Sequence, residues 1–223
     1  MDRNIIIISK NADDFLKSNL KSFGEVSELT ENLSLLKAES SHPDMQICKI
    51  NDSFCIVSPE IDDSITQLLS KYNVSYKKGI TYLSKEYPNN IAYNVLIGEK
   101  IFIHNIEYTD KLILETLYNL NKKSIYVKQG YSGCSSIFVK NILITSDYGV
   151  YKKATKENIK TILFKNPEII KLDGFEHGFL GGCCGCSEST GLLINCSEAF
   201  LPDYFIDELK SEKINFRCIG EGN

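Results

Sequence analysis

The fold of this chain is decided by residues 41–77, which read SHPDMQICKINDSFCIVSPEIDDSITQLLSKYNVSYK. Two apolar segments, residues 45–50 and 53–57, flank Asn51 and Asp52. Asparagine and aspartate favour the tight turn of an antiparallel hairpin. The stretch therefore predicts two strands joined by a two-residue turn.

A helix and a third strand are predicted after this hairpin. Asp62 or Asp63 can cap the helix, whose apolar side chains recur at the spacing that 3.6 residues per turn requires. These apolar positions are Ile65, Leu68, Leu69 and Tyr72. Residues 74–77 form the closing strand, so the complete unit is strand, strand, helix, strand.

The same unit returns along the chain. Its turn-rich openings lie at Asp44, Asn90, Cys134 and Gly182, at steps of 46, 44 and 48 residues. Such a period is typical of a repeat architecture. One hairpin with one helix cannot bury its own apolar face, so the units must pack on their neighbours. With an incomplete unit at the N-terminus, five modules are predicted, at about 1–40, 41–80, 81–129, 130–177 and 178–223.

The later modules follow the same order with local differences. In the third module, strands are expected at residues 91–97 and 100–104. In the fourth, a helix carries Ile159, Ile162 and Leu163, ends at Asn166-Pro167 and precedes a strand at 169–172. In the fifth, residues 183–188 form a poor strand on propensity, because glycine and cysteine replace β-branched residues.

Composition narrows the function classes. The chain has 29 acidic and 25 basic side chains, a net charge of -4 and no dense lysine or arginine block. It therefore carries no nucleic-acid signature. The apolar run at residues 5–8 is far too short for a signal-peptide core or a membrane span. We expect a cytoplasmic protein without a membrane signature, whose eight cysteines are thiols or ligands.

Helix-after-hairpin units of this length resemble the pentein, or guanidino-modifying enzyme, fold. The resemblance covers residues 1–223 and implies one α+β domain: a five-module pseudosymmetric α/β-propeller of ββαβ repeats around a central axis. Residues 41–47 (SHPDMQI), 128–131 (KQGY) and 178–182 (GFLGG) are similar to an uncharacterised bacterial family of this fold, of the DUF6873 type. A doubly wound parallel sheet is the second choice, but it predicts single strands between helices.

The pentein resemblance also implies a site, where the module openings approach the axis. Enzymes of this fold attack a guanidinium carbon with a cysteine thiolate, move protons with a histidine and hold the cation with carboxylates. Here the resemblance implies Cys134 as nucleophile, with His42 and Asp44 as a His-x-Asp pair. The expected substrate-binding residues are Asn90, Asp147, Glu176, Gly182 and Cys183.

The chain departs from the hydrolase pattern around Cys183. Known hydrolases place a glycine run, a histidine and then the nucleophile near the chain end, whereas Gly181-Gly182-Cys183 lacks that histidine. No cofactor is predicted; the alternative is zinc held by Cys183 and Cys186, at Cys-x-x-Cys spacing, with His177 as a third ligand. The structural interpretation is that the small residues, Gly185 included, let the backbone approach a crowded axis.

Two functions remain open from the sequence. The first is a small-molecule site, either a cysteine-dependent hydrolase or transferase of a guanidine or amidine, or a ligand-binding descendant of one. The second is a noncatalytic interaction protein with an unknown macromolecular partner. The second function rests on residues 51–60 and the helix after them, which resemble the repeat of eukaryotic translation initiation factor six.

Overall fold

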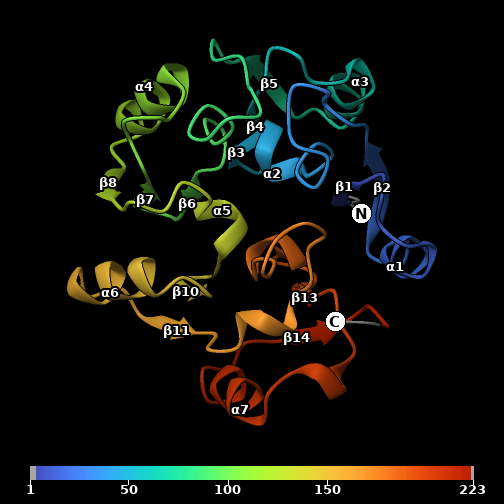
Figure 1. Ribbon diagram of the computed structural model, residues 1–223, viewed down its shortest axis with the longest axis vertical. Helices are drawn as coiled ribbons and strands as arrows, with labels where there is room; N and C mark the ends of the chain where they lie inside the picture. The colour runs from blue at the N-terminus through green and yellow to red at the C-terminus, as the bar shows by residue number, and fades with distance from the viewer. Residues whose placement is uncertain (1–3, 222–223) are drawn as a thin grey trace. The chain divides into compact units, whose positions relative to one another are not determined.

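The computed structural model describes residues 4–221 and shows a mixed α+β chain (Figure 1). The chain divides into two compact units. The first consists of Ala12–Glu25 and the described part of Cys134–Asn223, together with Asn4; the second consists of Ile5–Asn11 and Val26–Gly133. No helix in the described residues has the length and apolar character needed to cross a bilayer.

Short strands make up five small sheets within residues 4–221. They are β1 (Asn4–Ser9), β2 (Gly24–Leu29), β3 (Ile47–Asn51), β4 (Phe54–Val57), β5 (Ser75–Lys78), β6 (Leu96–Ile97), β7 (Ile101–His104), β8 (Lys123–Tyr126), β9 (Ser136–Val139), β10 (Ile142–Thr145), β11 (Thr161–Leu163), β12 (Cys184–Ser187), β13 (Gly191–Ile194) and β14 (Phe216–Cys218). β1 pairs with β2, and the other sheets have the orders β3-β4-β5, β6-β7-β8, β9-β10-β11 and β12-β13-β14.

The four three-stranded sheets share one pairing pattern. In each, the first two strands are antiparallel and the third is parallel to the second. The parallel strand follows a helix, because a parallel partner can be reached only by a crossover connection. The antiparallel pair in each of these sheets argues against the doubly wound parallel sheet.

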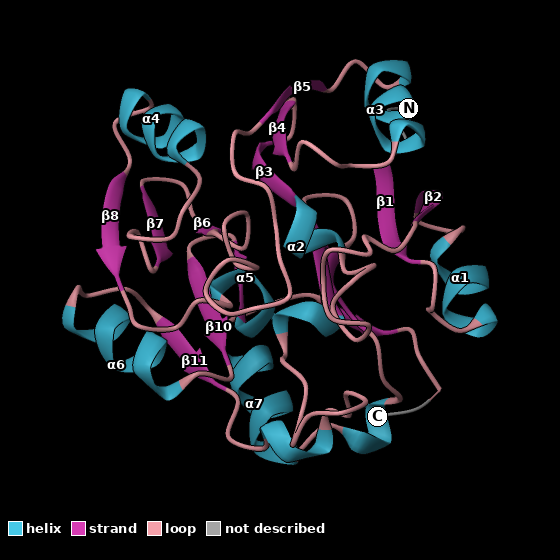
Figure 2. Ribbon diagram, turned by 45° about the horizontal axis from the view of Figure 1, so that its top comes forward, coloured by secondary structure: helices cyan, strands magenta, loops and turns pink. Residues whose placement is uncertain are grey.

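Seven α-helices lie within the described residues. They are α1 (Asp14–Leu20), α2 (Pro43–Gln46), α3 (Asp63–Lys71), α4 (Lys111–Asn119), α5 (Ser132–Ser135), α6 (Tyr148–Lys156) and α7 (Asp203–Ser211). The crossover helices pack on the strands of their own module, as α6 does on β11 (Figure 2). In the third module, the ring of Tyr118 on α4 meets that of Phe102 on β7 edge to face at 5.6 Å.

Aspartates begin four of these helices in the same way. The carboxylates of Asp13, Asp62, Asp110 and Asp147 each accept a hydrogen bond from a main-chain N–H in the first turn. This N-cap satisfies a donor that the helix itself leaves unpaired. Of the two caps proposed from the sequence for α3, the structure selects Asp62.

The C-termini of the nine-residue helices also share one conformation. Asn73, Asn121, Asn158 and Lys213 have φ between 53° and 59°, in the left-handed region. The main-chain N–H of the residue after each of them bonds back into the helix, as Val74 does to the Leu69 carbonyl oxygen at 2.9 Å. This is the Schellman arrangement, which ends a helix and redirects the chain into the closing strand.

The observed helix of the fourth module differs from the predicted one. The expected helix over Ile159, Ile162 and Leu163 is wrong: α6 ends at Lys156, and β11 (Thr161–Leu163) is the closing strand. The predicted strand at 169–172 is also wrong, because Pro167–Ile169 forms a turn of 3-10 helix.

Smaller differences affect three hairpins. α2 occupies Pro43–Gln46, so β3 starts two residues later than expected. Of the strand expected at residues 91–97 in the third module, only Leu96–Ile97 forms, as β6. Residues 91–95 are buried irregular chain. The poor strand expected at 183–188 does form, as β12, because Cys184 to Ser187 pair with β13 along their whole length.

Each unit has its own apolar core. In the second unit, Val57, Ile65 and Leu69 pack with neighbours from β2 and β4. In the first unit, a larger cluster includes Phe164 and Phe205, whose rings meet edge to face at 5.0 Å. Several cysteines border this cluster of the first unit and therefore lie among apolar side chains.

Candidate functional site

The predicted site residues belong to both units. His42, Asp44 and Asn90 lie in the second unit, and Cys134, Asp147, Glu176, Gly182 and Cys183 lie in the first.

A buried polar cluster of the second unit joins Glu39, Asn90 and Tyr131. The Tyr131 hydroxyl donates to Glu39 Oε1 at 2.8 Å, and Asn90 Nδ2 donates to Glu39 Oε2 at 2.9 Å and to the Tyr131 hydroxyl at 2.7 Å. Glu39 is 5% exposed and Asn90 is 1% exposed. A carboxylate is therefore buried against two neutral donors.

Two acceptors in this cluster lack the partner that their chemistry requires. Within residues 4–221, no lysine, arginine or histidine pairs with the Glu39 carboxylate. The Asn90 amide must turn its nitrogen toward Glu39, since a carboxylate only accepts. Its Oδ1 then points away from Glu39 and finds no donor among the described residues. Buried charges and buried amide oxygens without partners are costly, so both groups favour a ligand that donates.

Aromatic side chains border the cluster. The rings of Tyr87 and Tyr131 lie 6.1 Å apart at 30° to each other. Gly130, next to Tyr131, has no room for a side chain, because a Cβ there would lie 2.4 Å from Ile91 Cδ1. Two aromatic faces next to a carboxylate form an environment that suits a flat organic cation.

His104 fixes the backbone beside Tyr131. Its Nε2–H donates to the Gly130 carbonyl oxygen at 2.9 Å, and its Nδ1 lies 2.6 Å from the Thr109 hydroxyl. Burial lowers the pKa of His104 to about 4, while its hydrogen bond to Gly130 opposes the shift. The ring is therefore neutral at physiological pH. His104 is fully buried and both of its ring nitrogens are engaged, so its role is structural.

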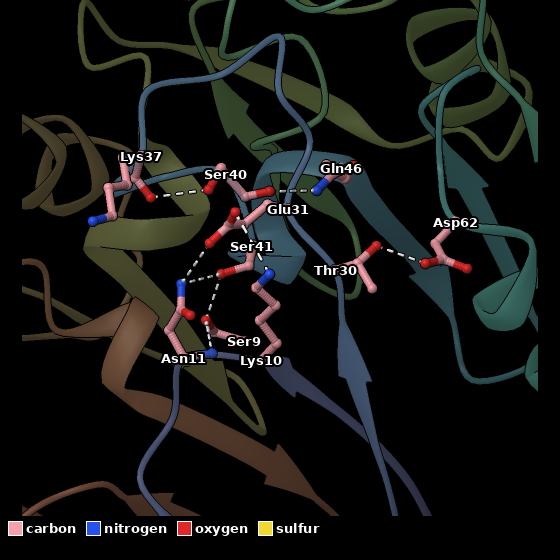
Figure 3. A network of polar contacts seen from close by, with 10 residues as sticks. All are labelled: Ser9, Lys10, Asn11, Thr30, Glu31, Lys37, Ser40, Ser41, Gln46 and Asp62. Atoms are coloured by element: carbon pink, nitrogen blue, oxygen red, sulfur yellow. Dashed lines mark hydrogen bonds and ion pairs between the residues drawn. The ribbon is translucent and has the colours of Figure 1, made fainter.

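The segment that carries Glu39 is held by a polar network (Figure 3). The Ser40 hydroxyl donates to the Lys37 carbonyl oxygen at 2.9 Å, and Gln46 Nε2 donates to the Ser40 carbonyl oxygen at 3.0 Å. The hydroxyl of Ser41 lies 2.6 Å from that of Ser9, at the end of β1. These contacts flank Glu39 in the chain and hold irregular backbone in one conformation.

His42 and Asp44 flank Pro43 at the start of α2. The main-chain N–H of His42 donates to the Glu39 carbonyl oxygen at 3.0 Å, and the Asp44 carbonyl oxygen accepts from Asn94 Nδ2 at 3.2 Å. Both side chains are half-buried, and in the described part of the chain no ion pair joins them. The expected His-x-Asp sequence is thus present, and among the described interactions no ion pair or hydrogen bond joins its two side chains.

In the first unit the predicted residues have separate surroundings. Cys134 is 5% exposed and lies in α5, the short helix before β9. Asp147 is the N-cap of α6 and accepts from the Val150 N–H at 2.7 Å. Glu176 is exposed in the loop before Gly178, and Gly182 and Cys183 form a 3-10 turn before β12. The cap accounts for Asp147, so we do not carry it into the proposed site.

The sequence suggested that small residues near Cys183 let the backbone approach a crowded axis, and the surroundings of two glycines there contradict this interpretation. A Cβ at Gly182 or Gly185 would meet no atom within 4 Å. Close backbone approach therefore does not explain these two glycines.

The described thiols of the first unit are not gathered with further metal-binding side chains. Among the described residues, no group of three or more histidine, cysteine, aspartate or glutamate side chains is arranged to hold a metal ion. His177 instead contacts the Gly178 carbonyl oxygen through Nδ1 at 2.8 Å and packs on Phe179. The Cys183, Cys186 and His177 alternative therefore gains no support.

Burial also makes several thiols poor nucleophiles. Cys196 Sγ and Cys218 Sγ are 3.9 Å apart. Burial raises the pKa of Cys196 to about 12 and that of Cys55 to about 11, and it raises the pKa of Cys218 as well. Cys218 is partly buried and packs against the apolar cluster of the first unit.

Sequence reasoning found Asn90 but missed Glu39 and Tyr131 as its partners. Tyr131 belongs to the KQGY segment already singled out by resemblance, which was an available signal. Glu39 gave none, since an acidic residue in a turn-rich segment is ordinarily solvated.

Solved structures of other proteins share this fold at low sequence identity. An adduct of a dimethylarginine dimethylaminohydrolase variant with S-methyl-L-thiocitrulline matches with a TM-score of 0.60 and 8% identity, over 98% of this chain and 92% of the other. ArgZ, an arginine dihydrolase of cyanobacteria, matches with 0.59 and 10% identity, over 97% of this chain but 36% of its own length. Agmatine deiminase of C. jejuni matches with a TM-score of 0.54 and 13% identity, over 97% of this chain and 75% of the other. The fold is thus that of the penteins.

Sequence comparison gives a narrower result. No curated protein matches the chain. Residues 7–221 match the family described as a family of unknown function (DUF6873). Because this match covers nearly the whole sequence, the chain belongs to the DUF6873 family.

Proposed function

We propose that this chain binds a small molecule with a guanidinium or amidinium group, and that Glu39 and Asn90 hold its cationic end. The observation that carries the proposal is a buried carboxylate beside a buried amide oxygen: among residues 4–221, no cation pairs with the first and no donor reaches the second. Both groups accept hydrogen bonds, and one is charged. A guanidinium matches them because it is planar, cationic and presents several N–H donors to a carboxylate in parallel.

The fold supports the same ligand class. The solved structures of similar fold are named for enzymes of dimethylarginine, arginine and agmatine, all of which contain a guanidine group. The four sheets of identical order, with β1 and β2, further support reading the chain as five pentein modules. Fold alone does not assign a function, so the argument rests on Glu39 and Asn90.

Calorimetric titration tests the binding proposal. We expect agmatine to bind and its neutral ureido analogue to bind at least tenfold more weakly, because only the guanidinium neutralises Glu39. The Glu39→Gln variant should lose the preference, since it keeps the shape and removes the charge. Glu31→Gln is the matched control, because Glu31 pairs with Lys10 outside the cluster.

The outcomes of this titration separate the two functions left open by the sequence. Equal affinity for both compounds, or unchanged affinity in Glu39→Gln, would contradict the cation site. If no guanidinium or amidinium compound binds, the noncatalytic docking function is favoured instead.

The hydrolase form of the proposal keeps Cys134 as the nucleophile, as the pentein resemblance implies. Thiol labelling tests it independently of binding. We expect iodoacetamide to label Cys134 before Cys55 or Cys218, whose thiol pKa values are raised by burial. Equal labelling of the three, or none at Cys134, would contradict a poised thiolate.

A further inference from the structure

The hydroxyl of Tyr131 occupies the place in which a ligand would meet Glu39. It donates to Glu39 Oε1 at 2.8 Å and accepts from Asn90 Nδ2 at 2.7 Å. A phenol is a neutral donor, so it fills the hydrogen-bonding position of a carboxylate oxygen without neutralising the charge. Any cation that binds Glu39 in the same direction must displace this hydroxyl.

Tyr131 is also the most exposed member of the cluster. Glu39 and Asn90 are buried, whereas Tyr131 is only half-buried. The neighbouring ring of Tyr87 is 52% exposed and lies 6.1 Å from that of Tyr131. The two rings are thus more exposed to solvent than the carboxylate.

The backbone at this position is fixed. The main-chain N–H of Tyr131 donates to Gln129 Oε1 at 3.0 Å, and His104 holds the carbonyl oxygen of Gly130 at 2.9 Å. The lack of space at the Gly130 Cα further restricts a shift of the chain. Access to Glu39 therefore requires the Tyr131 side chain to turn about its own bonds while the loop stays in place.

We propose that Tyr131 is the affinity-setting residue of the site: its hydroxyl competes with the ligand for Glu39, and its ring, with that of Tyr87, then contacts the bound cation. This inference rests on the proposed function. It also narrows the ligand class, because flat delocalised cations stack on aromatic rings better than a compact, strongly hydrated ammonium does. The site should therefore prefer agmatine over an unbranched diamine of similar length.

Two variants of Tyr131 separate the effect of its hydroxyl on affinity from the effect of its ring. Tyr131→Phe removes the competing donor and keeps the aromatic face, so agmatine should bind about tenfold more tightly, the effect of one hydrogen bond to a charged acceptor. Tyr131→Ala also removes the ring, so it should bind agmatine several-fold more weakly than Tyr131→Phe. Tyr82→Phe is the control, because Tyr82 is 69% exposed and lies outside the cluster.

A second readout follows the hydroxyl itself. Saturating agmatine should increase nitration of Tyr131 by tetranitromethane, measured by peptide mass spectrometry, and should leave Tyr82 unchanged. If Tyr131→Phe binds agmatine no more tightly than the unmodified chain while Glu39→Gln still abolishes binding, the role of Tyr131 is refuted and the cation site stands. If no variant, Tyr131→Phe included, binds agmatine or another guanidinium or amidinium compound, both proposals fall together.

Discussion

Replacing Asp110 by alanine should destabilise the chain far more than the same change at the other helix caps. Asp110 is fully buried and begins α4, where its Oδ1 accepts from the Leu112 N–H at 2.9 Å. Its Oδ2 accepts from the N–H groups of Ile80 and Thr81, both at 2.8 Å. One carboxylate thus caps a helix and holds the loop that leads to Tyr87 and Asn90.

The magnitude follows from these contacts. Loss of an N-cap costs about 1 kcal/mol. Each of the two loop N–H groups loses a bond to a charged acceptor, which contributes about 1.5–3 kcal/mol. We therefore expect Asp110→Ala to lower the free energy of unfolding by about 4–7 kcal/mol. Asp147→Ala removes a cap in the same module position without the two loop bonds and should cost about 1 kcal/mol.

Urea denaturation followed by circular dichroism measures both variants, and hydrogen exchange locates the effect. The amides of Ile80 and Thr81 should exchange faster in Asp110→Ala and not in Asp147→Ala. Equal losses of stability in the two variants, or unchanged exchange at Ile80 and Thr81, would refute the reasoning. Asp110 would then be a cap like the others.

Three further perturbations test other features. Glu39→Gln should raise the melting temperature by about 2–4 °C, a gain of about 1 kcal/mol, because it removes a buried charge that no cation of residues 4–221 neutralises. A lower melting temperature would show that the carboxylate stabilises the empty site. Lys213→Gly should stabilise by up to about 1 kcal/mol, since glycine adopts the left-handed conformation freely, whereas a loss in urea denaturation would contradict this. His104 should make stability depend on pH, because its folded pKa of about 4 lies below the ordinary value of 6.5. The contribution of the neutral ring to the free energy of unfolding, about 3 kcal/mol, is complete above pH 6.5 and is lost as the pH falls toward 4. His104→Gln should flatten the profile of unfolding free energy in that window, and an unchanged slope would contradict it.

Elements with local signals were predictable from the sequence. The cap at Asp62, the apolar face of α3 and the turn at Asn51 are each specified by residues in the element itself or directly beside it. The misplaced helix over Ile159, Ile162 and Leu163 shows the limit of such signals. Three apolar residues at that spacing fit one helix face, yet they also fit a short strand with a buried centre, and Ile162 is that centre in β11. Asn158 decides between them, because its left-handed conformation ends α6.

The candidate site depends on contacts that no local pattern carries. Asn90 bonds to Glu39 across 51 positions of sequence, and Tyr131 bonds to Glu39 across 92. Glu39 itself lies outside the helices and strands, in a segment held by side chains such as Ser40 and Gln46. Its burial follows from tertiary packing and could not be read from the residues around it.

The repeat nevertheless helps to separate structural residues from functional ones. Asp13, Asp62 and Asp147 recur at helix starts and perform one structural task, so the carboxylate of Asp147 needs no ligand to explain it. Departure from the repeat is not sufficient either, since Gly182 differs from its counterparts without any close contact that requires a glycine. Asn90 meets a stricter criterion: it departs from the repeat, and its buried amide oxygen lacks a donor among the described residues. A repeat position that is both exceptional and unsatisfied is the place where a ligand has something to supply.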